Sequence, residues 1–234
     1  MTSKADWPVI GSPVDHESDK RLFFDQHEWE TIEAATARII PTDHDPGARE
    51  AGVVRFIDRY LSGIDYIYAA ADGSGFLKIE GKEANAWRER IAEMQEKYRE
   101  GIRKLEEISR EKFGASFKDL SEAQQDEVLV AISGRPKPQP ITLTTEGEQN
   151  TFLQGVFDEG LDFFSALVLH TRQGFYCDPV YGGNKDYVGW RVIGFLGPKS
   201  LADTNTCKYS VKEYYVQNYD WADLIPHLRE KQGE

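Results

Sequence analysis

Apolar residues recur at helical spacing along most of this chain, which predicts a mainly α protein. In the clearest case, apolar side chains occupy positions i, i+3, i+4, i+7 and i+8 of one amphipathic helix. These side chains are Val53, Phe56, Ile57, Tyr60 and Leu61. Asp45 followed by Pro46 matches an N-cap with proline at the first helical position, so we expect this helix to begin there.

Two capping patterns mark further helix starts. Asp25 with Glu28 three residues later predicts a helix that ends at the next proline. Ser121 with Gln124 three residues later repeats the pattern and predicts a shorter helix.

A long charged stretch from about Ala84 to Phe113 carries apolar residues at near-heptad spacing. They are Trp87, Ile91, Met94, Tyr98, Leu105 and Ile108. This spacing predicts one long helix with a single buried seam. With one seam present, we expect it to pack against the chain's own helices rather than form a free coiled coil.

The most apolar stretch runs from about Glu146 to Arg172 and has apolar residues on more than one face. We therefore expect a central helix. His170 lies near its end, where a histidine interacts favourably with the helix dipole. As a lone histidine it is interpreted as a packed or capping residue rather than a base or a metal ligand.

The segment 174–198 is dense in glycine and aromatic residues and has no regular hydrophobic period. Glycine opens backbone angles closed to other residues, and aromatic rings need a large surface to bury against. We therefore expect a long ordered loop. Residues 1–22 are predicted to form an extended N-terminal arm, and 23–234 a single-domain helical bundle ending in an irregular, aromatic C-terminal tail.

The charge and the apolar content of the chain limit which partners and which cellular locations we expect. The net charge is −12 among 234 residues, which argues against nucleic acid or an anionic membrane surface as the main partner. No apolar run approaches the ~18 residues that a membrane span needs. The first residues show neither a twin-arginine pair nor an apolar signal core. Three possibilities stay open: the chain stays in the cytoplasm, it is exported together with another subunit, or its signal segment has been removed.

The candidate metal ligands are sparse. Cys177 and Cys207 are too few for a cysteine-rich zinc or iron–sulfur site. One disulfide, a bond to a partner and two free thiols all remain open. Asp43, His44 and Asp45 are adjacent, but they lack the spacing of a calcium loop, and turn or capping chemistry explains them. We expect no metal and no cofactor in this chain.

Common catalytic motifs are absent from the sequence. There is no glycine-rich dinucleotide or P-loop motif, no Gly-x-Ser-x-Gly elbow and no helix with paired zinc-binding histidines. An autonomous enzyme that uses His170, Cys177 and nearby carboxylates is the alternative, although no third group that would orient such a pair is visible. We expect no catalytic residue.

Three groups of segments together carry a family resemblance. They are residues 33–43 with 46–58, residues 117–126, and residues 170–175 with 178–184 and 189–195. The last group contains the block Asp-Pro-Val-Tyr-Gly-Gly-Asn followed by Gly-Trp. In this order they resemble the gluconate 2-dehydrogenase subunit 3 family, the small (gamma) subunit of bacterial flavin-dependent sugar and polyol dehydrogenases. The resemblance covers roughly residues 24–200.

The resemblance implies a non-catalytic helical subunit. Such a subunit binds, folds and stabilises a large dehydrogenase subunit of the glucose-methanol-choline type, which holds FAD and passes electrons to a cytochrome or another acceptor. It also implies assistance in export and a place in the periplasm or at the inner membrane. A chaperone that releases its flavoprotein client after folding is a further alternative.

The same block supplies the expected partner interface. Its members are Tyr176, Cys177, Asp178, Tyr181, Gly182, Gly183, Asn184, Trp190 and Phe195. Trp190 is expected to be an anchor, since tryptophan and tyrosine dominate binding energy at interfaces. If Trp190 is instead a core residue, its loss should unfold the protein. Cys177 lies inside the block, so a disulfide to the partner is conceivable in an oxidising compartment.

Overall fold

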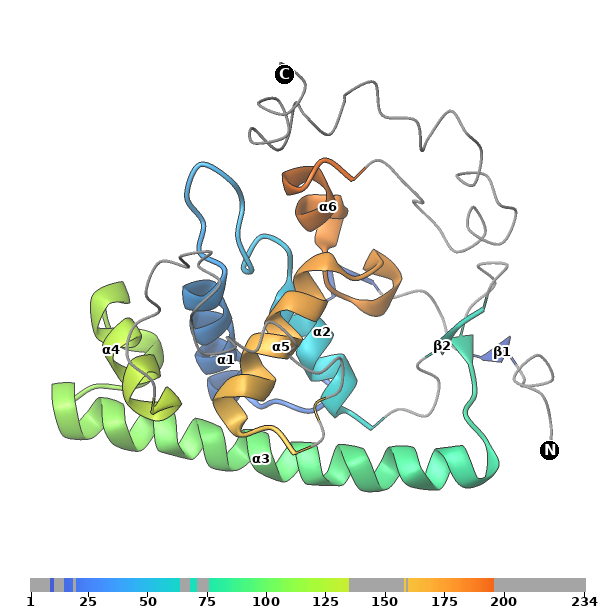
Figure 1. The fold of residues 1–234 in the computed structure, drawn as a ribbon, viewed down its shortest axis with the longest axis horizontal. Helices are drawn as coiled ribbons and strands as arrows, with labels where there is room; N and C mark the ends of the chain where they lie inside the picture. Colours follow the sequence, from blue (N-terminus) through green and yellow to red (C-terminus); the bar gives the residue numbers. More distant parts are fainter. Residues whose placement is uncertain are drawn as a thin grey trace, which may run out of the picture. The chain divides into compact units, whose positions relative to one another are not determined.

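A computed structural model describes residues 9–10, 15–18, 20–63, 68–70, 76–134, 158 and 160–195 (Figure 1). All of these belong to one compact unit that covers residues 1–70 and 74–196. The unit is mainly helical, as predicted. Cys207, the aromatic tail and residues 146–157 of the expected central helix lie outside the described residues. The single domain from 23 to 234 therefore stays a prediction.

The elements have the following bounds. The α-helices are α1 (Gln26–Ile39), α2 (Val53–Leu61), α3 (Gly81–Phe113), α4 (Glu122–Ser133), α5 (Phe163–Tyr176) and α6 (Val188–Val192), the 3-10 helices are η2 (Phe117–Asp119), η3 (Pro179–Tyr181) and η4 (Lys185–Tyr187), and the strands are β1 (Val9–Ile10), β2 (Tyr68–Ala69) and β3 (Phe76–Leu77). The strands pair antiparallel in the order β1–β3–β2.

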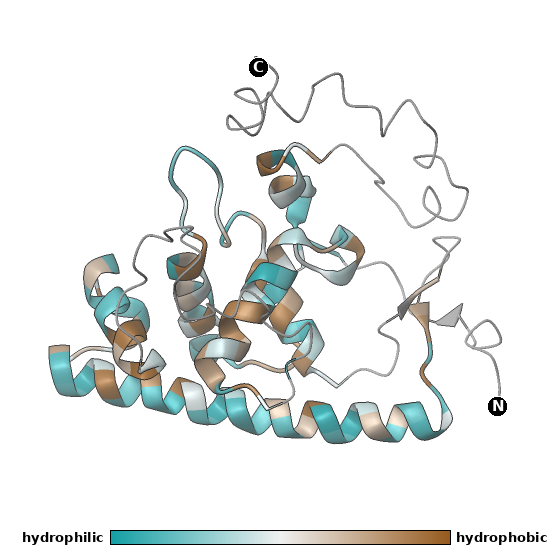
Figure 2. Cartoon of the chain, in the orientation of Figure 1, coloured by the Kyte–Doolittle hydropathy of each residue, from teal (hydrophilic) through white to brown (hydrophobic). Residues whose placement is uncertain are grey.

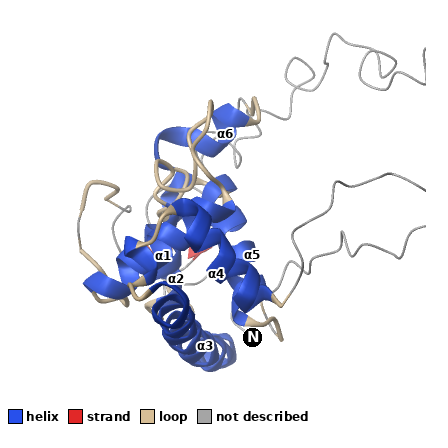
Figure 3. Ribbon diagram, turned by 90° about the vertical axis from the view of Figure 1, so that its left-hand side faces the viewer, coloured by secondary structure: helices blue, strands red, loops and turns tan. Residues whose placement is uncertain are grey.

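The long helix α3 supports the other helices. Seen along its axis, α1, α2, α4 and α5 lie to one side of it (Figure 3), and all four contact it. Five of the six predicted seam residues are buried, and Ile108 is half-buried at the edge of the core. The opposite face is hydrophilic (Figure 2). The seam thus packs within the chain, as predicted, because the other helices supply the apolar surface that it needs.

Both predicted capping boxes are present. The Asp25 side chain accepts a hydrogen bond from the Glu28 N–H at 2.8 Å, and the Glu28 carboxylate accepts one from the Asp25 N–H at 3.0 Å. Ser121 and Gln124 do the same at the start of α4. Each pair satisfies two backbone donors that would otherwise lack a partner at the helix start.

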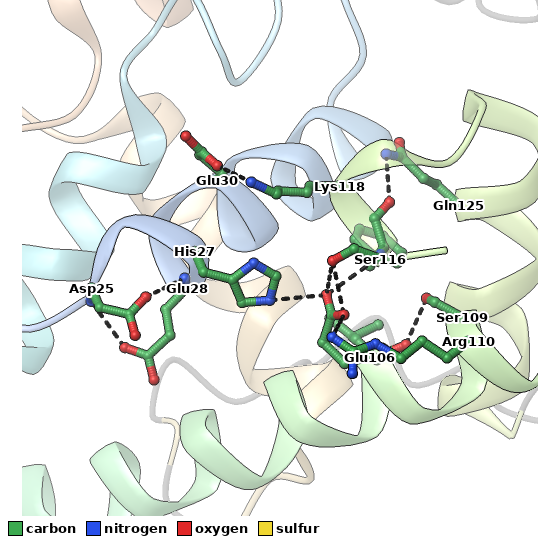
Figure 4. A network of polar contacts seen from close by, with 12 residues as sticks. Asp25, His27, Glu28, Glu30, Glu106, Ser109, Arg110, Ser116, Lys118 and Gln125 are labelled. Carbon is green, nitrogen blue, oxygen red and sulfur yellow. Dashed lines mark hydrogen bonds and ion pairs between the residues drawn. The ribbon is translucent and has the colours of Figure 1, made fainter. Parts of the chain in front are cut away.

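Glu106 joins α3 to two neighbouring segments (Figure 4). Its carboxylate accepts hydrogen bonds from the Ser116 hydroxyl and from the Phe117 N–H, and it lies 3.3 Å from Nε2 of His27 on α1. Gln125 on α4 donates to the Phe117 carbonyl oxygen at 3.1 Å. The segment between α3 and α4 is thereby fixed against both helices.

The N-terminal arm is held by its backbone. The buried Asp58 carboxylate on α2 accepts hydrogen bonds from three successive N–H groups, those of Leu22, Phe23 and Phe24, at 2.7, 3.0 and 2.8 Å. A carboxylate on backbone donors is a strong, charge-assisted contact. These contacts fix residues 22–24, which lie between the predicted arm and α1.

One predicted helix start is wrong, and the predicted central helix is not continuous before α5. Helix α2 begins at Val53 rather than Pro46, because Gly47 packs against the backbone of residues 40–42 and Gly52 adopts a left-handed conformation with φ of 64°. Helix α5 begins at Phe163, because Asp162 caps it through the Ser165 N–H at 2.8 Å. Residue 158 and residues 160–162 before it are not helical.

The segment 174–198 is ordered over its described residues but is not one irregular loop. Residues 174–176 form the last turn of α5, and η3, η4 and α6 follow in close succession. Helical periodicity cannot reveal elements this short, since each spans about one turn. Within the described part of the chain, no helix is both long and apolar enough to cross a bilayer.

The crossing of α3 and α5 depends on Gly101. A Cβ atom added there would lie 2.1 Å from Cγ of Phe163, whose ring also packs edge-on against Tyr98 at a centroid distance of 5.4 Å. We predict that Gly101→Ala destabilises the protein by roughly 2 kcal/mol, because the steric cost exceeds the gain of about 1 kcal/mol in helix propensity. Urea unfolding of both proteins measures the difference.

The matched control repeats the Gly101 substitution in a protein from which the Phe163 ring has been removed. In a Phe163→Ala background, Gly101→Ala should be neutral or stabilising, since only the propensity gain remains. A more stable Gly101→Ala variant in the wild-type background would show that the two helices are not in close contact at this point.

Candidate functional site

The glycine- and aromatic-rich block builds a cap on the C-terminal end of α5. The Asn184 side chain bridges two backbone groups: its Nδ2 donates to the Cys177 carbonyl oxygen at 2.8 Å, and its Oδ1 accepts from the Gly189 N–H at 2.8 Å. The Trp190 indole Nε1–H donates to the Tyr176 carbonyl oxygen at 2.8 Å. Carbonyl groups that a helix end leaves without partners are thus satisfied by side chains from downstream.

Glycine is required where the block meets α5. A Cβ atom at Gly183 would lie 2.1 Å from the Gly174 carbonyl oxygen, and one at Gly189 would lie 2.0 Å from the Phe175 carbonyl oxygen. Both contacts are with backbone, which cannot move aside as a flexible side chain could. The two glycines therefore set how closely the cap approaches the helix.

The cap contains a cluster of strained backbone. Asn184, Asp186 and Tyr187 have φ of 48°, 54° and 60°, and they are the positive-φ residues other than glycine among the described residues. Such conformations cost free energy and persist only where surrounding contacts impose them. Here the Asn184 bridge and the N–H of Lys185, which donates to the Ala51 carbonyl oxygen at 3.0 Å, hold the path.

Other contacts tie the block to the arm and to the small sheet. His16 Nε2 lies 2.9 Å from the Pro179 carbonyl oxygen. The Tyr181 ring packs edge-on against Phe76 of β3 at a centroid distance of 6.4 Å. Asp178 caps η3 through the Val180 N–H at 2.9 Å. Segments far apart in sequence therefore meet at this cap.

The structure divides the nine expected interface residues by exposure. Gly182, Gly183, Asn184 and Trp190 are buried; Cys177, Asp178 and Tyr181 are half-buried; Tyr176 and Phe195 are exposed. Trp190 is 8% exposed and belongs to the packed cap, so its loss is expected to damage the fold first. Of the nine, we keep Tyr176 and Phe195 as the residues that another protein could contact.

Sequence reasoning missed two exposed apolar residues, Val192 and Ile193, which are 37% and 57% exposed. They follow Trp190 after one residue, Arg191, and Phe195 returns to pack its ring edge-on against Trp190 at 5.0 Å. An apolar run at the end of a glycine-rich block was a usable signal. It was ambiguous because such a run is typical of core as well as of surface contact.

A family model described as gluconate 2-dehydrogenase subunit 3 matches residues 26–197. The chain belongs to this family. The resemblance found in the sequence is therefore confirmed, and the chain is a subunit of a dehydrogenase complex. No curated protein and no solved structure matches the chain.

A second polar cluster lies inside this subunit 3 chain. The Asp158 carboxylate accepts hydrogen bonds from the Tyr60 hydroxyl, from Nε of Arg90 at 2.9 Å and from Nε2 of His170 at 3.0 Å. On the other side of the imidazole ring, Nδ1 of His170 lies 2.8 Å from the Tyr98 hydroxyl. The cluster joins α2, α3 and α5 to the chain preceding α5.

Burial and charge together set the protonation states in this cluster. Burial by itself would raise the pKa of Asp158, but hydrogen bonds from His170, Tyr60 and Arg90 outweigh it and hold that pKa well below its usual range. Burial and the neighbouring carboxylate raise the pKa of Tyr60. Asp158 thus stays ionised, with the tyrosine neutral as its donor.

The His170 and Asp158 side chains are 1% and 2% exposed. His170 is thus a packed residue, as predicted, and both its ring nitrogens have partners. The autonomous-enzyme alternative gains no support from this geometry, because both side chains are buried and His170 bonds to Tyr98 and Asp158 rather than to Cys177.

Cys177 is a half-buried free thiol whose Sγ lies 3.5 Å from the Gly174 carbonyl oxygen. Burial raises the pKa of this thiol to about 12. Since the thiolate is the reactive form, the raised pKa makes Cys177 a weak nucleophile at neutral pH. A disulfide to a partner through this residue stays untested.

Two further places were considered as ligand sites. Asp43, His44 and Asp45 place one ligand atom each within 4.8 Å of the others, but all three side chains are exposed and the turn geometry accounts for them. A groove of about 680 Å³ between α1 and α3 is lined by charged residues that pair with one another, such as Arg103 with Glu96. Neither place is assigned a ligand.

Loss of the Asp158 charge should weaken the fold. We predict that Asp158→Asn destabilises the protein by about 3 kcal/mol at pH 7, since an amide cannot accept the charge-assisted hydrogen bonds that Tyr60, Arg90 and His170 give to the buried carboxylate. Because the folded pKa of Asp158 is depressed, its stabilisation is present above the unfolded pKa near 4 and is lost as pH falls below it.

Urea unfolding at several pH values checks this expectation. The gap between wild type and Asp158→Asn should be full at pH 7 and shrink below about pH 4. Glu93→Gln removes an exposed carboxylate from an ion pair with Lys97 and should change stability by less than about 0.5 kcal/mol. Equal stability of wild type and Asp158→Asn at pH 7 would contradict the assignment.

The protected Cys177 thiol should react slowly. In a Cys207→Ser variant, we predict that iodoacetamide alkylates the folded protein at pH 8 on the order of 100-fold more slowly than the urea-unfolded chain. The reason is the raised pKa, which keeps the thiolate scarce until strongly alkaline pH. Mass spectrometry of timed samples measures both rates, and similar rates would show that the cap does not shield this thiol.

Proposed function

We propose that this chain is the non-catalytic small subunit of an FAD-dependent sugar or polyol dehydrogenase. In this role it binds a large flavoprotein subunit of the glucose-methanol-choline type, assists its folding and stabilises it. FAD is held by the large subunit, which carries out the oxidation, and electrons leave through a cytochrome or another acceptor. The observation that carries the proposal is the family match over residues 26–197.

The site geometry supports a binding role. The polar groups that could serve chemistry, Asp158, His170 and Cys177, are engaged inside the fold, whereas the cap on α5 is rigid and exposes apolar side chains. A preorganised surface binds with a smaller loss of conformational entropy than a flexible one. These features suit a subunit that offers a surface to a partner.

We further propose that the assembled complex works in the periplasm or at the inner membrane, with this chain assisting the export of its partner. A cytoplasmic complex is the alternative. Fractionation of cells that express both subunits distinguishes these two locations, because it measures the compartment in which the complex accumulates.

Co-expression with the flavoprotein encoded beside this chain tests the function. We expect a tag on this chain to recover a yellow complex of fixed stoichiometry that reduces a dye when sugar is added. The flavoprotein expressed alone serves as the control and should be insoluble or inactive. A flavoprotein that is fully active alone, together with a colourless small subunit recovered without it, would overturn the proposal. A transient contact that leaves an active, free flavoprotein would favour the chaperone alternative.

A further inference from the structure

The exposed apolar surface of the described residues is concentrated at one place. Five large hydrophobic residues are exposed, and four of them, Tyr176, Val192, Ile193 and Phe195, lie at the end of α5 or at the end of α6. We call these four residues together with Arg191 the α6 face. Hydrophobic colour at the end of α6 is visible in Figure 2. Clustered exposure of this kind marks an interaction site more often than scattered single residues do.

The α6 face is held rigidly from beneath. Trp190 links its two halves, because its indole N–H donates to the Tyr176 carbonyl oxygen and its ring packs against Phe195. The Phe195 N–H donates to the Trp190 carbonyl oxygen at 2.8 Å, so the chain beyond α6 folds back onto it. Tyr176 packs edge-on against Phe175 at 4.9 Å. The exposed side chains therefore stand on a fixed scaffold rather than on a loose loop.

The charge of the α6 face limits what it can bind. Arg191 is exposed and is the sole charged residue from 187 to 195, in a chain whose net charge is −12. An isologous contact with a second copy would place two Arg191 side chains within one small patch, and like charges at an interface are costly. An apolar surface with a carboxylate opposite Arg191 fits better.

Resting on the proposed function, we propose that the α6 face is the surface on which the catalytic flavoprotein subunit docks. The partner supplies an apolar, aromatic-lined depression for Ile193 and Phe195 and a carboxylate for Arg191. Tyrosine, arginine and large apolar side chains on a rigid base are the usual composition of a binding hot spot. The buried glycines and Asn184 of the block act through this face, since they fix its position without touching the partner.

Photo-crosslinking in the 234-residue chain tests which molecule occupies the face. p-Benzoylphenylalanine replaces Ile193, and the protein is co-expressed with the adjacent flavoprotein and irradiated. We expect a crosslink to the flavoprotein. The matched control carries the same group at Leu22, the fifth exposed hydrophobic residue, which is 41% exposed and lies on the N-terminal arm; it should give little of this product. A crosslink to a second copy, or one to residues 196–234 of the same chain, would overturn the proposal.

The second measurement is the yield of complex formed by variants with single substitutions on the α6 face. Ile193→Asp and Arg191→Glu should each lower the yield of yellow complex about ten-fold or more, whereas Leu22→Asp should leave it unchanged. Because these side chains are exposed, the thermal melting of each variant alone should match that of the wild type. Wild-type levels of complex with Ile193→Asp would overturn the docking face and leave the proposed function standing. Failure of the wild-type chain to form any complex would overturn both.

Discussion

The close approach of backbone to backbone at the end of α5 is the constraint on which the rest of this structure depends. Gly183 and Gly189 lie so near the carbonyl groups of Gly174 and Phe175 that no side chain fits between them. Asn184 and the Trp190 indole then satisfy carbonyl groups that the helix end would leave unpaired. This packing and the Lys185 N–H bond to the Ala51 carbonyl oxygen together hold the strained turn at residues 184–187 and the α6 helix that follows it.

The cap satisfies the backbone groups at the end of α5 with hydrogen bonds from the Asn184 and Trp190 side chains. That property suits the proposed role, in which the oxidation takes place in a partner chain. A binding surface works best when its side chains are already in place before the partner arrives. Most of the residues that characterise the block in sequence are buried or half-buried and support its structure. The exposed residues are mostly their neighbours in sequence.

The interior depends on a different interaction, a network of hydrogen bonds between polar side chains. Asp158, His170 and Tyr98 are buried and form a connected set of polar groups with the half-buried Tyr60, each with a partner, and Arg90 closes the set toward the surface. A fully satisfied network of this kind specifies one arrangement of helices, because any shift leaves a buried group unpaired. In this chain the network positions α2, α3 and α5 together with the chain that leads into α5.

The sequence alone was sufficient for the helical class, for the seam of α3, for both capping boxes and for the family, because these rest on local spacing and short motifs. It was misleading at Pro46 and at the start of α5, where Gly47, Gly52 and Asp162 override the local signal. Only the tertiary structure showed that Trp190 and Asn184 are buried while Ile193 and Phe195 are exposed, and that Asp158 meets His170. Exposure and long-range pairing depend on which segments pack together, and the spacing of residues along one segment carries no record of its neighbours in space.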